Sequence, residues 1–154
     1  MKHMWSEEEI QSFKKDISNL VDSKGNPRFI EGEGTPLTME GFTSTYCKWS
    51  LSGTHLMFVL SATITNTTVI QDSTILATFS LPEWIINKIY PVWDSNLESK
   101  NLVLYASDYT NQSTICRLTK DTNNMKIIKS GGSAVTLTKD RSFRIQFDLL
   151  IDSE

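Results

Sequence analysis

The sequence has little of what enzymes use to hold a metal or to activate a nucleophile. Its 154 residues include two cysteines and two histidines, and Cys47 and Cys116 lie far apart in segments that alternate like strands, which is typical of buried free thiols. Metal sites need clustered ligands, so we expect no metal and no cofactor. The motifs GxSxG and HExxH and a glycine-rich phosphate loop are absent. His55 heads a predicted strand and is interpreted as a solvent-facing residue, so no catalytic residues are predicted.

Long apolar runs and clusters of positive charge are also missing. The longest apolar run, residues 56–60, is far too short to cross a bilayer, and the N-terminal segment has no apolar stretch of the kind found in secretion signals. The net charge is −3, and Lys14 and Lys15 are the only adjacent basic pair. We therefore expect a protein made in a cytoplasm, with no membrane insertion and no nucleic-acid partner.

A short amphipathic helix is predicted within residues 5–22. Ser6 and Glu9 have the spacing of a capping box, and Gly25 and Pro27 end the helix. Its apolar residues follow the a and d positions of two heptads and are Ile10, Phe13, Ile17 and Leu20.

Two heptads are marginal on their own in water, so the apolar face of this helix must pack on something. One possibility is the remainder of its own chain. The other is a short parallel bundle of identical helices, in which isoleucine at both a positions leaves a trimer open.

From residue 28 to residue 154 the pattern is that of a β domain. Glycine and proline between residues 25 and 36 predict an irregular approach segment. Residues 42–52 and 55–64 then alternate on either side of Gly53 and predict the best hairpin of the sequence. A short helix is predicted after Pro82. About eight short strands with frequent turns predict a mainly β fold, an antiparallel jelly-roll-like sandwich, with a closed barrel as the alternative.

The last strand, residues 143–151, alternates most clearly, and we expect it in the centre of a sheet.

Two predicted loops combine an aromatic residue with aspartate and asparagine. An exposed ring can stack on a sugar while the polar groups bind its hydroxyls. The candidate ligand-binding residues are therefore Trp93, Asp94, Asn96, Asp108, Tyr109 and Asn111. The more ordinary interpretation of Trp93 is a core aromatic at one end of the sandwich.

A pair of carboxylates is the remaining route to catalysis. Glycosidases use two carboxyl groups about 5–9 Å apart, and such partners need not be close in the sequence. The candidates on strands or loops are Glu31, Glu33, Asp94 and Asp108. An acidic residue on a loop is most often simply solvated, so a hydrolase is the least favoured interpretation.

Two segments, KWSLSGTHLMFVLSATI and ATFSLPEWIINKIYPV, resemble the β-sandwich modules of bacteriophage tail and baseplate fibre proteins. The first resembles a W-x-L-S-G hairpin and the second an L-P-x-W-I-x-x-K-I-Y-P segment. The residues that carry the resemblance are Trp49, Leu51, Ser52, Gly53, Leu81, Pro82, Trp84, Ile85, Lys88, Ile89, Tyr90 and Pro91. The similar stretch covers about a third of the chain.

The resemblance implies a non-enzymatic virion protein. Such proteins are typically homotrimers, in which a helix attaches to the particle and a β head contacts the host surface, often a glycan. The resemblance would make Ile10, Phe13, Ile17 and Leu20 the oligomerisation residues. No long fibrous shaft separates helix and head, so a linking or decorating subunit is as compatible as a receptor-binding tip. The alternatives are a stand-alone carbohydrate-binding module and, less favoured, a small glycan hydrolase.

Overall fold

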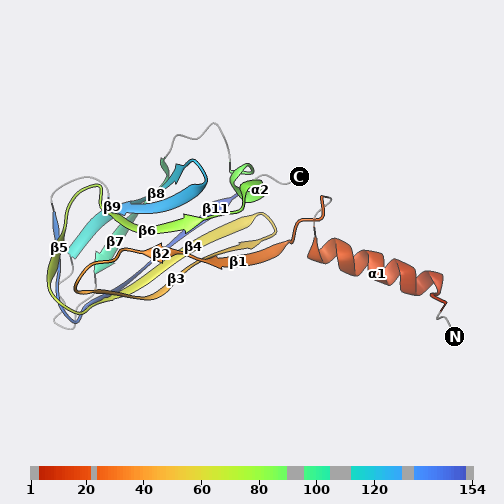
Figure 1. Ribbon diagram of the computed structural model, residues 1–154, viewed down its shortest axis with the longest axis horizontal. Coiled ribbons are helices and arrows are strands. Elements are labelled where there is room, and N and C mark those ends of the chain that lie inside the picture. Colours follow the sequence, from red (N-terminus) through yellow and green to blue (C-terminus); the bar gives the residue numbers. More distant parts are fainter. Residues whose placement is uncertain (1–3, 22–23, 90–95, 105–111, 130–133, 152–154) are drawn as a thin grey trace.

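The computed structural model describes residues 4–21, 24–89, 96–104, 112–129 and 134–151 (Figure 1). Two antiparallel sheets face each other, and a helix lies outside them. The four-stranded sheet has the order β1 (Phe29–Glu33), β3 (Phe42–Ser52), β4 (His55–Ile64), β11 (Ser142–Leu150). The five-stranded sheet has the order β2 (Thr35–Pro36), β6 (Ile75–Ser80), β9 (Asn124–Lys129), β8 (Gln112–Asp121), β7 (Asn96–Leu104). The predicted mainly β, antiparallel sandwich with an N-terminal helix is confirmed.

Two short strands and two helices complete the described part of the chain. Strands β5 (Thr68–Ile70) and β10 (Val135–Leu137) form a two-stranded sheet, and the helices are α1 (Glu7–Leu20) and α2 (Glu83–Ile86). In α2, Ile85 and Ile86 are buried, and Trp84 packs against the core while staying partly exposed. The predicted helix after Pro82 therefore covers part of the core.

The core lies between the inner faces of the two sheets. Strand β4 buries every second residue from Leu56 to Ile64, as its sequence predicts, and buries Val59 as well. Phe58 is fully buried. Its ring contacts that of Phe79 from β6, with 5.1 Å between the ring centroids. Trp49 is 4% exposed. Aromatic and branched side chains from both sheets thus form one hydrophobic core, which is the main source of stability in a domain of this size.

The last strand lies at an edge of its sheet, so its predicted central position is wrong. Among the strands that the structure describes, β11 pairs with β4 alone. Its inner residues Phe143, Ile145 and Phe147 are nevertheless buried, because the opposite sheet covers them. Alternation reports that one face of a strand is buried, but it does not report how many strands flank it.

The segment predicted to be irregular contains two strands that belong to different sheets. Strand β1 pairs with β3 as far as Glu33, and β2 pairs with β6 of the opposite sheet from Thr35. Gly34 is the crossing residue, and its backbone N–H donates to the carbonyl oxygen of Cys47 at 2.8 Å. A Cβ atom here would lie 2.5 Å from the ring of Phe79. The close approach requires glycine.

Helix α1 begins with the predicted capping box. The Glu9 backbone N–H donates to Ser6 Oγ at 3.1 Å, and the Ser6 backbone N–H donates to Glu9 Oε1 at 3.2 Å. These reciprocal bonds satisfy donors at the helix N-terminus that have no partner within the helix.

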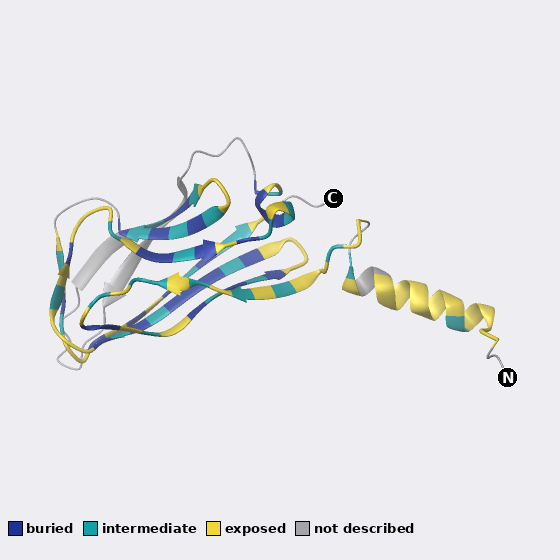
Figure 2. Ribbon diagram, viewed as in Figure 1, coloured by how far each residue is buried: buried dark blue, intermediate teal, exposed yellow. Residues whose placement is uncertain are grey.

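The apolar face of α1 is exposed to solvent (Figure 2). The exposed fractions are 41% for Ile10, 47% for Phe13, 57% for Ile17 and 68% for Leu20. Figure 1 shows the helix extending away from the sheets rather than lying on them. Of the two packing partners that the sequence leaves open, its own sandwich is not the one used in this structure.

Candidate functional site

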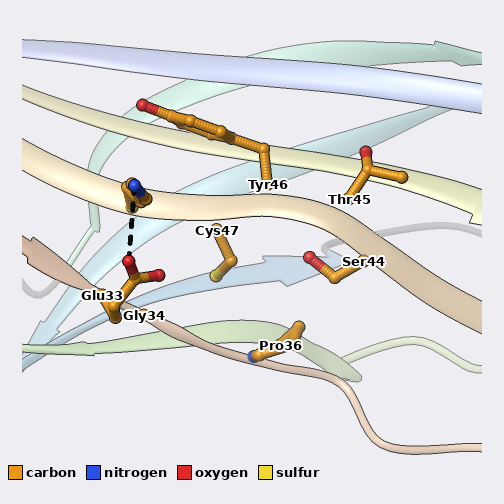
Figure 3. Close-up of a pocket in the computed structure, with 8 residues that line it drawn as sticks. Glu33, Gly34, Pro36, Ser44, Thr45, Tyr46 and Cys47 are labelled. Atoms are coloured by element: carbon orange, nitrogen blue, oxygen red, sulfur yellow. Dashed lines mark ion pairs between the residues drawn. The ribbon is translucent and has the colours of Figure 1, made fainter.

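A β-bulge in β3 creates the starting geometry of the candidate site. Ser44 pairs with Ala62 and Tyr46 pairs with Ser61, so Thr45 is an extra residue in β3. The Thr45 hydroxyl donates to the Ser61 carbonyl oxygen at 3.2 Å. Figure 3 shows Thr45 and Tyr46 on the opposite side of the strand from Cys47. The bulge thus directs two successive side chains outward, which is a common use of bulges near binding sites.

Beside this bulge lies a hollow of about 340 Å³. It opens where β1 stops pairing with β3 and the chain crosses at Gly34 to the opposite sheet. Its lining comes from both sides of that gap and consists of Glu33, Gly34, Pro36, Ser44, Thr45, Tyr46, Cys47 and Lys48 (Figure 3). The hollow is therefore a product of the strand crossing and the bulge together.

An ion pair and an aromatic ring lie together at this hollow. Lys48 Nζ is 3.4 Å from Glu33 Oε1 and 5.3 Å from the centroid of the Tyr46 ring. The hydrogen bond to Glu33, together with the charge of Glu33, raises the pKa of Lys48, so the ammonium stays charged. Tyr46 is 42% exposed. The site thus combines a ring surface with both hydrogen-bond donors and acceptors, which suits a small hydroxyl-rich ligand.

The thiol that lines the hollow is chemically quiet. Cys47 is free and buried, and its burial, helped by the charge of Glu33, raises the pKa of the thiol to about 11. Cys116 is also free and buried, and burial raises its pKa to about 12 against a smaller opposing effect of Lys129. Both groups are protonated at neutral pH, so neither is an activated nucleophile. The predicted buried free thiols are confirmed.

His55 lies on the exposed face of the four-stranded sheet, as predicted. Its Nε2 is 2.8 Å from Asp148 Oδ1. The side-chain amide nitrogen of Gln146 donates to the other oxygen of the same carboxylate, Asp148 Oδ2, at 3.2 Å. The histidine side chain is half exposed. These contacts form a polar network on the surface of the sheet.

Most of the ligand-binding residues predicted from the sequence lie outside the described residues. These are Trp93, Asp94, Asp108, Tyr109 and Asn111. Asn96 is described, but it opens β7 opposite Thr119 rather than lying in a loop. The loop prediction for that residue is wrong, because β7 already begins at Asn96.

Two of the four predicted carboxylate candidates lie on β1. Glu31 and Glu33 are both exposed on β1, and Asp94 and Asp108 lie outside the described residues. Among the described residues that line the hollow, Glu33 is the single carboxylate, and it pairs with Lys48. This hollow therefore lacks the two carboxyl groups that glycoside hydrolysis requires.

Sequence reasoning missed Tyr46, Thr45 and Lys48 as candidate site residues. A signal exists in the sequence, because the alternation of β3 starts cleanly only at Cys47 and is irregular before it.

Within the described ranges, no cluster of three or more histidine, cysteine, aspartate or glutamate residues could hold a metal ion. None of the helices in those ranges is long and apolar enough to span a membrane.

The chain was compared with known proteins. No family model matches the sequence, and no curated protein matches it significantly. Among solved structures, it is similar to the bovine atadenovirus type 4 fibre head protein, with 12% identity, a TM-score of 0.40, and coverage of 77% of this chain and 97% of that one. It is also similar to the reovirus attachment protein sigma1, solved in complex with alpha-2,3-sialyllactose, with 5% identity, a TM-score of 0.35, and coverage of 86% and 74%. Both TM-scores are below 0.5, so function has to be argued from the residues of this chain.

Proposed function

We propose that this chain is a non-enzymatic phage virion protein of the tail, baseplate or fibre kind. In this proposal residues 5–22 form an oligomerising helix and residues 28–154 form a β head that contacts other virion proteins and a host-surface glycan. The observation that carries it is the exposed apolar face of α1. Four large apolar residues in one stripe, each more than two-fifths exposed, need a partner in water.

Copies of the same chain are the partner that this stripe fits best. A 14-residue helix is marginal alone, and its a/d spacing is that of a coiled-coil seam. Ile10 and Ile17 at the a positions are compatible with two or three strands. The trimer is favoured by the resemblance to phage fibre modules.

The first test is the solution molar mass of the intact chain, measured by light scattering coupled to size-exclusion chromatography. We expect a mass near three times 17.5 kDa. A mass near twice 17.5 kDa, that of a dimer, would retain the helix as an oligomerisation element but exclude the trimer. A monomer at tens of micromolar concentration would contradict the proposed function and leave a stand-alone β module.

Glycan binding is the second part of the proposal, and the hollow beside the β3 bulge favours it. An exposed Tyr46 ring next to the Glu33–Lys48 pair provides both a stacking surface and polar partners for sugar hydroxyls. The same arrangement would serve a stand-alone carbohydrate-binding module. A second set of ligand contacts stays proposed, and it consists of Trp93, Asp94, Asn96, Asp108, Tyr109 and Asn111.

Replacing Tyr46 with alanine tests which of these two sets of residues binds the glycan. We expect Tyr46→Ala to weaken binding to the best ligand in an immobilised glycan panel about tenfold, the effect of losing about 1.4 kcal/mol of stacking. Phe29→Ala is the matched control, because Phe29 is another exposed aromatic on the same sheet but does not line the hollow. Binding that survives Tyr46→Ala but is lost in Trp93→Ala would place the site in the predicted loops. No binding to any glycan would contradict this part of the proposal.

A further inference from the structure

We infer that the hollow beside the β3 bulge binds uncharged sugars through pairs of neighbouring hydroxyl groups and discriminates against acidic sugars. This inference rests on the proposed glycan binding and adds the class of sugar. Three properties of the hollow lead to it, and they are its balance of charge, its hydrogen-bond donors and acceptors, and the spacing of its ion pair.

Negative charge outweighs positive charge at the end of β1 that borders the hollow. Glu31 and Glu33 are two residues apart in this strand, so their side chains lie on the same face of the sheet. Lys48 pairs with Glu33 across the two strands. The hydrogen bond to Glu33 and its charge raise the pKa of Lys48, and the charge of Glu31 adds to this effect. One ammonium group thus interacts with two carboxylates, and a carboxylate on a ligand would meet a net negative charge.

Arg144 is a further basic side chain on this face, and it does not reverse the balance. Tyr46 and Arg144 both pair with Ser61, one from each side of β4, so their backbones lie two strand spacings apart, about 10 Å. Arg144 is exposed and donates to Gln146 at 3.4 Å. Salt at physiological strength screens most of the interaction between exposed charges at such a separation.

The side chains at the hollow offer more acceptors than donors to a ligand. The Glu33 side chain is 74% exposed and holds the ammonium through Oε1, which leaves Oε2 to accept from a ligand. The hydroxyls of Ser44 and Thr45 both donate to the carbonyl oxygen of Ser61, at 3.5 Å and 3.2 Å, so toward a ligand they act as acceptors. A carboxylate ligand can only accept, whereas each sugar hydroxyl can also donate. The hollow therefore matches neutral hydroxyl groups.

The spacing of the Glu33–Lys48 pair fits two adjacent hydroxyls (Figure 3). Lys48 Nζ and Glu33 Oε1 are 3.4 Å apart, which is longer than the roughly 2.7–2.9 Å of a tight charge-assisted hydrogen bond. Oxygens on neighbouring carbons of a sugar ring lie about 3 Å apart, roughly one hydrogen-bond length. One hydroxyl can then donate to the carboxylate while its neighbour accepts from the ammonium. Both charges keep polar partners, so binding leaves neither of them unsatisfied.

The remaining lining suits the apolar face of a sugar ring. Pro36 and the buried thiol of Cys47 line the hollow, and the ring of Tyr46 is 42% exposed. Lys48 Nζ is 5.3 Å from the centroid of that ring, so one sugar can contact the ring and the ion pair together. The volume of about 340 Å³ is near the lower end of ligand pockets, roughly 300–1,000 Å³. We therefore expect one or two sugar rings to occupy it.

A matched set of sugars tests the inference on the full-length chain. The probes are the methyl glycosides of glucose, galactose and mannose, each beside its uronic acid, in which a carboxylate replaces the C6 hydroxymethyl group. Where only larger glycans bind, the comparison is between a neutral glycan and the same glycan carrying an acidic sugar. Binding is measured by ligand-observed NMR at low salt. We expect the neutral form to bind about tenfold more tightly, and we expect added salt to reduce the difference.

Glu33→Gln tests whether charge causes the preference. The change keeps the size of the side chain and one acceptor oxygen but removes the negative charge. We expect the preference for the neutral form to fall severalfold, because the acidic form gains affinity. Glu83→Gln is the matched control, since Glu83 is exposed and does not line the hollow, and it should leave the preference unchanged.

The outcomes separate this inference from the proposed glycan binding. Acidic sugars that bind as tightly as neutral ones would overturn the inference and leave glycan binding intact. A preference that Glu33→Gln does not alter would do the same. Binding that survives Tyr46→Ala but is lost in Trp93→Ala would also overturn the inference, because the site would then lie in the predicted loops. A chain that binds no sugar at all would overturn both.

Discussion

Replacing Ile10 and Ile17 with serine is expected to convert the oligomer to a monomer. Both residues are exposed in the single chain, so their substitution should cost the folded chain little. In a trimer the change removes six isoleucines from the interface, each worth roughly 1.5–3 kcal/mol when fully buried. Even half of the lower value for all six would weaken association about a thousandfold or more. Serine has nearly the same helix propensity as isoleucine, so loss of the helix is not the cause.

The measurement is molar mass by light scattering over a concentration series, with thermal unfolding of the β head in parallel. Gln11→Ser and Lys15→Ser form the matched control, because both residues are exposed and lie outside the a and d positions. We expect the control to keep the wild-type mass. We also expect the unfolding temperature of the monomeric double variant to change little beyond the loss of association. An oligomer that persists in Ile10→Ser with Ile17→Ser would show that another surface holds the copies together.

The features predicted correctly are those determined by residues close together in the sequence. The capping box needs only Ser6 and Glu9, and the β3–β4 hairpin needs two alternating segments and the turn at Gly53. The face of each strand follows from alternation, as Phe58 illustrates. Local signals of this kind also placed the short helix after Pro82, because proline is favoured in a first helical turn.

The features that the sequence did not predict depend on which distant segments pair. The edge position of β11 is decided by the number of its neighbours and not by its own residues. The hollow forms because β1 stops pairing with β3 after Glu33, and the bulge forms because Thr45 has no pairing partner in β4. The Glu33–Lys48 contact is a consequence of that register. Residue types identified the apolar helix face, but its exposure to solvent is visible only in the fold.

Replacing Gly34 with a larger residue is expected to destabilise the sandwich more than the same change at a glycine with open surroundings. A Cβ atom at Gly34 would lie 2.5 Å from Phe79 Cδ1 and 2.7 Å from Cys47 Sγ, both far inside normal contact distance. Phe79 is fully buried and packs on Phe58, so its ring cannot move aside without disturbing that contact. Overpacking a core typically costs about 1–3 kcal/mol. We expect Gly34→Ala to lie in that range, and Gly34→Val, which adds two more methyl groups, to lie at or above its upper end.

The free energy of unfolding, measured by chemical denaturation, distinguishes this steric cause from a backbone effect. Gly53→Ala is the control, because Gly53 has a φ of +63° but a Cβ atom there would meet nothing within 4 Å beyond its chain neighbours. Its cost should therefore be about 1–2 kcal/mol and purely conformational.

A double-mutant cycle with Phe79→Leu gives the decisive comparison. If the Phe79 ring causes the clash, the smaller leucine relieves part of it, and the combined cost falls below the sum of the two single costs. Phe79→Leu should show no such coupling with Gly53→Ala, which lies in the β3–β4 hairpin turn. Additive costs for Gly34→Ala and Phe79→Leu would mean that the crossing strand can move away from the core, and that the hollow beside it is adaptable rather than fixed.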